Sequence, residues 1–193
     1  MRPQQHPLFG FTTKANGIAR ELINEIYISE LHDDGSPEPI KRPYTAIWDT
    51  GATNSVITRK VVQELNLQPS GRAPCSVVGA ADQLTTHDAD TFLVDIYLPN
   101  NVRITGLRVS EMSVGGGEVL LGMDIIAHGD FAVTNYNGQT WWTFRVPSSE
   151  PIDFVKEIND HNLRHQPQGG NPQLREWVEK NRKKQGMRKK KRK

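Results

Sequence analysis

The sequence predicts an all-β protein, a small barrel or orthogonal sandwich with one or two short helices and a helical or disordered C-terminal extension. Three observations support this fold class. Short runs of alternating apolar and polar residues recur up to about residue 147, and turn residues separate them. Asn137-Gly138 lies between two β-rich runs, which is a strong hairpin signal. After Pro147 the alternation stops and polar and charged residues dominate.

The first three expected strands lead to an acidic residue. One strand is expected around Phe9 and Phe11, and a second within Leu22–Leu31. The third has alternate residues on one face and ends at Asp49. The residues expected on that face are Tyr44, Ala46 and Trp48.

A short helix should follow, with Thr58 as its N-cap and Val61, Val62 and Leu65 on one side. The next strand is expected to reach Val78 and enter a loose turn. Strict alternation predicts a long strand over residues 92–98, and Asn100-Asn101 predicts a turn. The apolar run Val119–Leu121 suits a buried strand. The final hairpin should have the arms Phe131–Tyr136 and Gln139–Val146.

The tetrapeptide Asp49-Thr50-Gly51-Ala52 is the candidate catalytic motif. A carboxylate at the end of a buried strand is costly unless it is paired or functional. Two carboxylates that share one proton can hydrolyse a peptide, one acting as a base on water and the other as an acid toward the carbonyl oxygen. Thr50 offers a hydroxyl across such a pair, Gly51 allows close backbone approach, and Ala52 leaves room for substrate.

Only one Asp-Thr-Gly occurs in the chain. Asp124 follows Leu121-Gly122-Met123 and lacks the Thr-Gly that should come next, so we reject it as the second catalytic carboxylate. One motif in a chain of this length predicts a twofold homodimer, with the two copies of Asp49 meeting at the axis.

These segments resemble the retropepsins, and most closely the retropepsin-like proteins of bacteria and phages. The resemblance covers roughly Phe9 to Pro147. The residues that carry it are Ile47–Ala52, Val119–Ile126, Gly129–Val133 and Trp142–Pro147. It implies a retropepsin-type acid protease barrel and an aspartic endopeptidase that acts on a protein or peptide substrate.

The resemblance also implies supporting elements around the motif. Leu120, Leu121 and Gly122 would lie against the active-site loop. Val78, Gly79, Ala80, Ala81 and Asp82 would form the substrate-binding flap, although retroviral flaps are usually richer in glycine than this segment. A short helix would begin in Met123–Ile126.

The domain organisation follows from composition. We expect a protease domain over residues 1–147, a linker with a short helix over 148–171 and a basic, disordered tail over 172–193. A helix is expected near Ile152–Ile158. The tail contains 11 Lys and Arg residues against two Glu, a net charge of +9, while the whole chain has a net charge of +2. Such a tail is either a solvated terminus or an electrostatic contact for nucleic acid or another polyanion.

The remaining signals predict a cytoplasmic protein with no cofactor, no metal and no membrane contact. Cys75 is the single cysteine, which fits a reducing compartment. No apolar run has the length of a signal peptide or a membrane-spanning helix. His161 and His165 are the one pair of histidines four residues apart, and we interpret them as solvated side chains and not as zinc ligands.

Three classes of function therefore stay open at the level of sequence. The first is a homodimeric aspartic endopeptidase. The second is a catalytically inactive module of the same fold that binds an extended peptide or a partner protein. The third is a polyanion-binding protein in which the tail dominates. An intact Asp49-Thr50-Gly51-Ala52 favours the first, because a binding module needs no acid there.

The tail gives the first testable prediction. We expect a chain that ends at Gly170 to lose RNA or DNA binding that the full chain shows. Binding by the full chain should weaken steeply as salt rises, because it releases counterions rather than reading bases. A salt-titrated binding assay on both chains measures this. Equal binding by the two chains, or binding indifferent to salt, would leave the tail as a solvated terminus.

Overall fold

The computed structural model describes residues 7–32, 37–78, 84–165, 176–177 and 179–180. Contacts divide the chain into two units, Met1–Glu150 and Pro151–Lys193. The first unit carries the strands and two short helices, and the second carries helix α3 (Phe154–Arg164). The division falls near the change of character at Pro147, and the expected domain boundaries stay a prediction.

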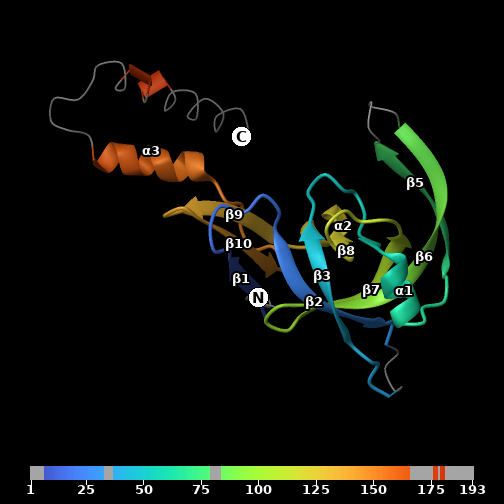
Figure 1. Cartoon of the computed structure of the whole chain (residues 1–193). Coiled ribbons are helices and arrows are strands. Elements are labelled where there is room, and N and C mark those ends of the chain that lie inside the picture. The colour runs from blue at the N-terminus through green and yellow to red at the C-terminus, as the bar shows by residue number, and fades with distance from the viewer. Residues whose placement is uncertain (1–6, 33–36, 79–83, 166–175, 178, 181–193) are drawn as a thin grey trace, which may run out of the picture. The chain divides into compact units, whose positions relative to one another are not determined.

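Six strands of the first unit close into a barrel (Figure 1). They are β2 (Ile23–Glu30), β3 (Arg42–Trp48), β4 (Val56–Ile57), β6 (Leu84–Leu98), β7 (Val102–Glu111) and β8 (Val119–Leu121). The order β2-β3-β8-β4-β7-β6 returns to its start, because Tyr27–Glu30 pair with residues 94–97 of β6. Strand β5 (Gly71–Val78) pairs with the other part of β6. The ring confirms the expected all-β barrel.

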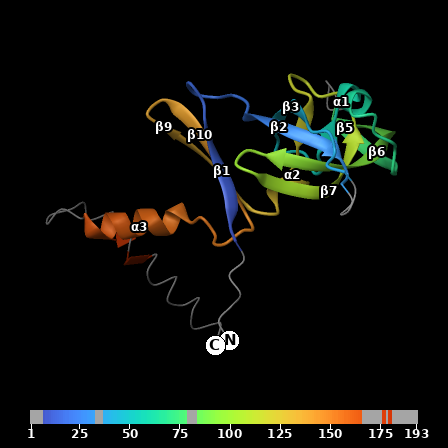
Figure 2. The same ribbon diagram turned by 90° about the horizontal axis from the view of Figure 1, so that it is seen from below.

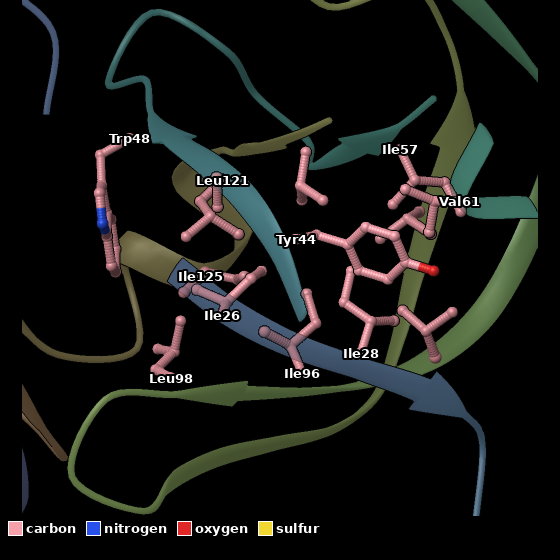
Figure 3. Close-up of a cluster of buried hydrophobic side chains, with 14 of the residues drawn as sticks. Ile26, Ile28, Tyr44, Trp48, Ile57, Val61, Ile96, Leu98, Leu121 and Ile125 are labelled. Carbon is pink, nitrogen blue, oxygen red and sulfur yellow. The ribbon is translucent and has the colours of Figure 1, made fainter. Parts of the chain in front are cut away.

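The barrel interior is filled by the alternate residues that the sequence indicated. Tyr44, Ala46 and Trp48 of β3 are all buried, and so are the alternating apolar residues of β2 and β6 (Figure 3). Those residues are Ile26, Ile28, Phe92, Val94, Ile96 and Leu98. Strand β6 has an irregularity between Val94 and Ile96, where the fully buried Asp95 accepts hydrogen bonds from Arg103 and the Gly106 amide.

Both asparagine turns have the backbone that the sequence predicted. Asn100 and Asn101 have φ values of 56° and 60°, and they connect β6 to β7. Asn137 and Gly138 have φ values of 50° and 73°, and they connect β9 (Asp130–Tyr136) to β10 (Gln139–Val146). Positive φ at both central residues is typical of the tight turns that match the twist of a hairpin.

The helices are short in the first unit and longer in the second. Helix α1 (Arg59–Glu64) follows Thr58, which occupies the expected N-cap position without a side-chain capping bond. Helix α2 (Met123–Ile126) begins where the sequence suggested. Helix α3 extends beyond the expected Ile152–Ile158, and Asp153 caps it by accepting a hydrogen bond from the Lys156 amide at 3.1 Å. In the described part of the chain the helices are too short or too polar to cross a membrane.

A second sheet joins the two ends of the first unit. Its order is β1-β10-β9, where β1 is Phe9–Lys14, and Figure 2 shows these strands side by side. We call it the terminal sheet. Asp130 of β9 accepts hydrogen bonds from Arg145 of β10, Ser148 and the Ser149 amide. Hydrogen bonds from Ser148 and Arg145 lower the pKa of Asp130 to about 2, so this contact stays ionised in mild acid.

One buried asparagine ties the terminal sheet to the barrel. The side-chain oxygen of Asn24, in β2, accepts hydrogen bonds from the indole nitrogens of Trp48 at 2.9 Å and Trp142 at 2.8 Å. Its amide nitrogen donates to Thr13 of β1 at 2.8 Å. The Trp48 ring also stacks on Phe131 at 5.0 Å between centroids. The polar atoms of this junction are therefore satisfied inside an aromatic cluster.

Removal of the shared oxygen should be costly. We expect Asn24→Leu to lower the free energy of unfolding by about 2 kcal/mol or more, since each stranded indole N–H costs about 1–3 kcal/mol. Replacement of the exposed Asn16 by Leu serves as the control and should change stability by less than about 0.5 kcal/mol. Urea unfolding measures both. Equal effects of the two substitutions would show that the buried junction contributes no stability of its own.

Candidate active site

Asp49 lies at the end of β3, where the strand leaves the barrel. Its backbone N–H donates to the Leu121 carbonyl oxygen at 2.9 Å, so the ladder between β3 and β8 continues to this residue. The side chain is half-buried, and its Oδ1 accepts a hydrogen bond from the Gly51 amide at 2.8 Å. A β-carbon at Gly51 would lie 3.1 Å from the same oxygen. Glycine at 51 therefore lets the loop fold back onto the carboxylate.

The other two motif residues continue this turn. Thr50 is exposed, and the Ala52 amide donates to the Asp49 carbonyl oxygen at 3.3 Å. The structure thus brings Asp49, Thr50, Gly51 and Ala52 together in one tight loop, with the carboxylate and the threonine accessible from outside the barrel. Their roles in catalysis stay a prediction.

Strand β8 supports this loop from within the barrel. It lies between β3, with which it runs parallel, and β4, with which it runs antiparallel. Leu120 pairs with Ile47 on one side and Val56 on the other, and Leu121 pairs with Trp48. The strand that contains Leu120 and Leu121 is consequently wedged between the strand before the loop and the strand after it.

Gly122 is the closest approach between β8 and the loop. A β-carbon there would lie 2.7 Å from the Asn54 carbonyl carbon, 2.8 Å from the Asn54 oxygen and 3.0 Å from the Ala52 oxygen. These contacts are all with backbone atoms, so no side chain could rotate away. Glycine is required here by space, since two backbones pass each other without room for a methyl group.

The loop has one side-chain contact, between Ser55 and Asp124, that the sequence did not indicate. The Asp124 carboxylate accepts a hydrogen bond from the Ser55 amide at 2.8 Å and another from the Ser55 hydroxyl at 2.7 Å. Asp124 is thus placed against the loop, but it faces Ser55 and is not free for the chemistry. No local pattern indicates a pairing between residues so far apart. The available signal was an acid two residues after the glycine that follows a buried strand.

The expected flap is flanked by a long pair of strands. Strands β5 and β6 are antiparallel with continuous pairing from Gly71 opposite Thr91 to Val78 opposite Leu84. Val78 is therefore the last residue of β5. Gly79, Ala80, Ala81 and Asp82 lie outside the described residues, so their assignment to a flap stays a prediction.

A hollow of about 530 Å³ lies beside these strands, and one wall begins at Thr58, directly after β4. It is lined by the start of α1, by His87 of β6 and by the residues that end β7. Its walls carry charges of both signs, because Arg59, Lys60 and Glu111 all line it, and Arg59 lies 3.9 Å from Glu111. Such a surface suits polar groups of an extended ligand.

Candidate metal and thiol residues are not grouped in the described ranges. No cluster of three or more His, Cys, Asp or Glu residues that could hold a metal ion occurs among them. His161 and His165 are exposed and stack at 4.2 Å between ring centroids on α3. Cys75 is half-buried in β5 and pairs with His87 across the ladder.

Comparison with known proteins agrees with this geometry. Residues 41–128 match the family described as "gag-polyprotein putative aspartyl protease". The matched region runs from the start of β3 to the end of α2, so it includes the Asp49 loop, β8 and the strands on either side of the expected flap. The comparison with curated proteins gave no match.

Two solved structures are similar in outline. A retropepsin-like aspartic protease from Rickettsia conorii is 10% identical with a TM-score of 0.41, and the alignment covers 74% of this chain and 98% of that one. The EIAV protease in complex with the inhibitor HBY-793 is 17% identical with a TM-score of 0.41, over 58% of this chain and 91% of that one.

The closed barrel with the Asp49 loop at the end of β3 is a retropepsin-like fold. The family match over residues 41–128 supports the similarity to retropepsin-like aspartic proteases that the sequence had indicated.

The close approach at Gly122 gives a direct prediction for the site. We expect Gly122→Ala to displace the loop, to lower the free energy of unfolding by about 1–3 kcal/mol and to reduce peptide hydrolysis. Gly115→Ala is the matched control, because nothing lies within 4 Å of the added carbon. Urea unfolding and an activity assay report the two effects. Equal behaviour of the two variants would mean that the loop can accommodate a side chain at Gly122.

Proposed function

We propose that the protein is an aspartic endopeptidase whose active site is built by two copies of the chain. The observation that carries this proposal is the placement of Asp49. Its carboxylate is half-buried, is oriented by the Gly51 amide and emerges from a loop that β8 supports on its inner side. The match of residues 41–128 to an aspartyl protease family supports the same chemistry.

The need for a second copy follows from the number of available carboxylates. The chain contains one Asp-Thr-Gly. Asp124, which contacts the same loop, accepts a hydrogen bond from Ser55 at each of its two carboxylate oxygens. Hydrolysis by this route needs two carboxyl groups that share a proton. A twofold axis that brings two Asp49 loops together supplies the second group from an identical chain.

In the proposed reaction one Asp49 is ionised and the other is protonated. The ionised carboxylate takes a proton from water while the water oxygen bonds to the substrate carbonyl carbon. The protonated carboxyl gives its proton to the carbonyl oxygen, which forms a neutral tetrahedral diol. The C–N bond then breaks as the amide nitrogen takes the proton of the protonated Asp49. A hydroxyl of the diol gives its proton to the ionised Asp49 as the carboxylic acid forms. The products are a carboxylic acid and an amine, and the dyad regains its single proton.

The substrate is proposed to bind as an extended peptide. A β-rich cleft recognises such a peptide by main-chain pairing, and alternate side chains fill pockets. The long ladder of β5 and β6 supports this idea, since it leads to Val78 and the expected flap residues Gly79 and Ala80. The polar hollow beside β6 offers room for substrate side chains.

The competing proposal is a catalytically inactive module that holds a peptide or partner in the same cleft. It shares the barrel and the extended ligand but makes no use of the Asp49 charge. A substitution at Asp49 therefore distinguishes the two proposals, because it should abolish hydrolysis by a protease and leave peptide binding by an inactive module unchanged.

We expect Asp49→Asn to reduce peptide hydrolysis by about 100- to 10,000-fold, the usual contribution of acid–base catalysis, with fold and assembly unchanged. Asp160→Asn, at an exposed acid on α3, is the matched loss of charge and should leave hydrolysis unaltered. The assay uses a peptide library at acidic to neutral pH. Circular dichroism and sedimentation confirm the folded state of each variant.

The wild-type protein should also lose specific activity on dilution, because a separated chain carries half of a site. Sedimentation over the same concentration range shows whether the loss follows dissociation. Hydrolysis that survives in Asp49→Asn would refute the mechanism. A fully active monomer would refute the shared site, and peptide binding without hydrolysis by the wild type would favour the inactive module.

A further inference from the structure

Asp124 is the acidic residue that the proposed chemistry leaves without a role, and its surroundings are specific. Its carboxylate is partly buried, and both oxygens are engaged by a single residue, Ser55. Ser55 is fully buried and ends the loop that Asp49 begins. We infer that Asp124 is a positioning residue, which holds the loop through Ser55 so that the Asp49 carboxylate points toward its partner. This inference rests on the proposed protease function.

The first support is a chain of hydrogen bonds that links Gly122, Ser55 and Asp124. The Gly122 amide donates to Ser55 Oγ at 3.0 Å. Ser55 Oγ donates to Asp124 Oδ1 at 2.7 Å, and the Ser55 amide donates to Asp124 Oδ2 at 2.8 Å. The carboxylate can accept both donors at once only in one orientation. Hydrogen bonds to an ionised acceptor are about twice as strong as neutral ones, so this contact restrains Ser55 well.

The second support is the beginning of helix α2. The Met123 amide donates to the Ala52 carbonyl oxygen at 2.8 Å, and the Asp124 amide donates to the Thr53 oxygen at 3.1 Å. The first amides of a helix have no partner within it. Here the carbonyl oxygens of the loop accept these hydrogen bonds, so Asp124 binds the loop through both its backbone amide and its side chain.

These contacts hold the loop of residues 49–55 at both of its ends. Asp49 itself is bonded to Leu121 at the start, and Ser55 is bonded to Asp124 at the end. Between them Thr50 is exposed, and Ala52 and Thr53 accept the hydrogen bonds from the start of α2. Loss of the Asp124 side chain would therefore remove the side-chain restraint on Ser55, while the backbone hydrogen bonds of the loop and the strand that precedes Asp49 stay in place.

The predicted effect is on turnover more than on substrate affinity. A displacement of about 1 Å in a catalytic group can cost about 100-fold in rate, because the reacting atoms no longer meet in line. We expect Asp124→Ala to lower kcat by about 10- to 100-fold with KM changed by less than about twofold. Asp124→Asn should recover most of this loss, since an amide oxygen can accept the Ser55 N–H and the amide nitrogen can donate to Ser55 Oγ.

The experiment compares these two variants with Ser55→Ala, in the full-length protein. Ser55→Ala removes two of the hydrogen bonds but keeps the Ser55 amide, so its kcat should lie between that of the wild type and that of Asp124→Ala. Asp160→Ala is the control for loss of an exposed carboxylate. Amide hydrogen exchange of residues 49–55 is measured for every variant by mass spectrometry.

The exchange measurement separates this inference from the proposed function. Faster exchange of residues 49–55 in Asp124→Ala, reversed in Asp124→Asn, supports the positioning role even if no peptide is hydrolysed. An inactive wild type would sink the protease proposal alone. Unchanged exchange and kcat in both Asp124→Ala and Ser55→Ala would overturn the positioning role. If Asp124→Ala does not fold, Ser55→Ala decides between these outcomes.

Discussion

The contact between Asn24 and two indole rings holds the end of the strand that leads to Asp49. Trp48 is the last residue of β3, and its ring stacks on Phe131 of the terminal sheet. Because Asn24 also binds Trp142, the strand before Asp49 is held against β10 by one amide oxygen. The aromatic cluster around Trp48 excludes water from this oxygen, so the bond has no competitor. The barrel and the terminal sheet are thereby joined at Trp48, the residue directly before Asp49.

The loop itself depends on a second constraint, the packing of β8 between β3 and β4. Its carbonyl oxygen at Leu121 fixes Asp49, its glycine admits the loop backbone, and the helix that follows binds Ser55. The two ends of the loop are therefore controlled by one segment, residues 121–124. Such control leaves the carboxylate of Asp49 as the part of the loop that can meet a partner. The proposed reaction needs two carboxylates, and a single chain so arranged offers one.

Much of this architecture follows from local sequence. Alternation placed β2, β3 and β6 with their buried faces, and Asn137-Gly138 located the last hairpin, because turn geometry and burial act within a few residues. The pairing of Asp124 with Ser55 could not be predicted in this way, since the two residues are 69 positions apart in the sequence. The role of Asn24 was hidden for the same reason. The length of α3 was underestimated because its polar C-terminal half has no apolar pattern.

The most direct test of the shared site is a mixing experiment. Wild-type and Asp49→Asn chains are unfolded together, refolded at constant total concentration and assayed across all ratios. If each site needs two Asp49 carboxylates, activity follows the square of the wild-type fraction, so an equal mixture retains about a quarter of full activity. A proportional decline, with about half of the activity in the equal mixture, would show that one chain carries a complete site and would contradict the dimeric dyad.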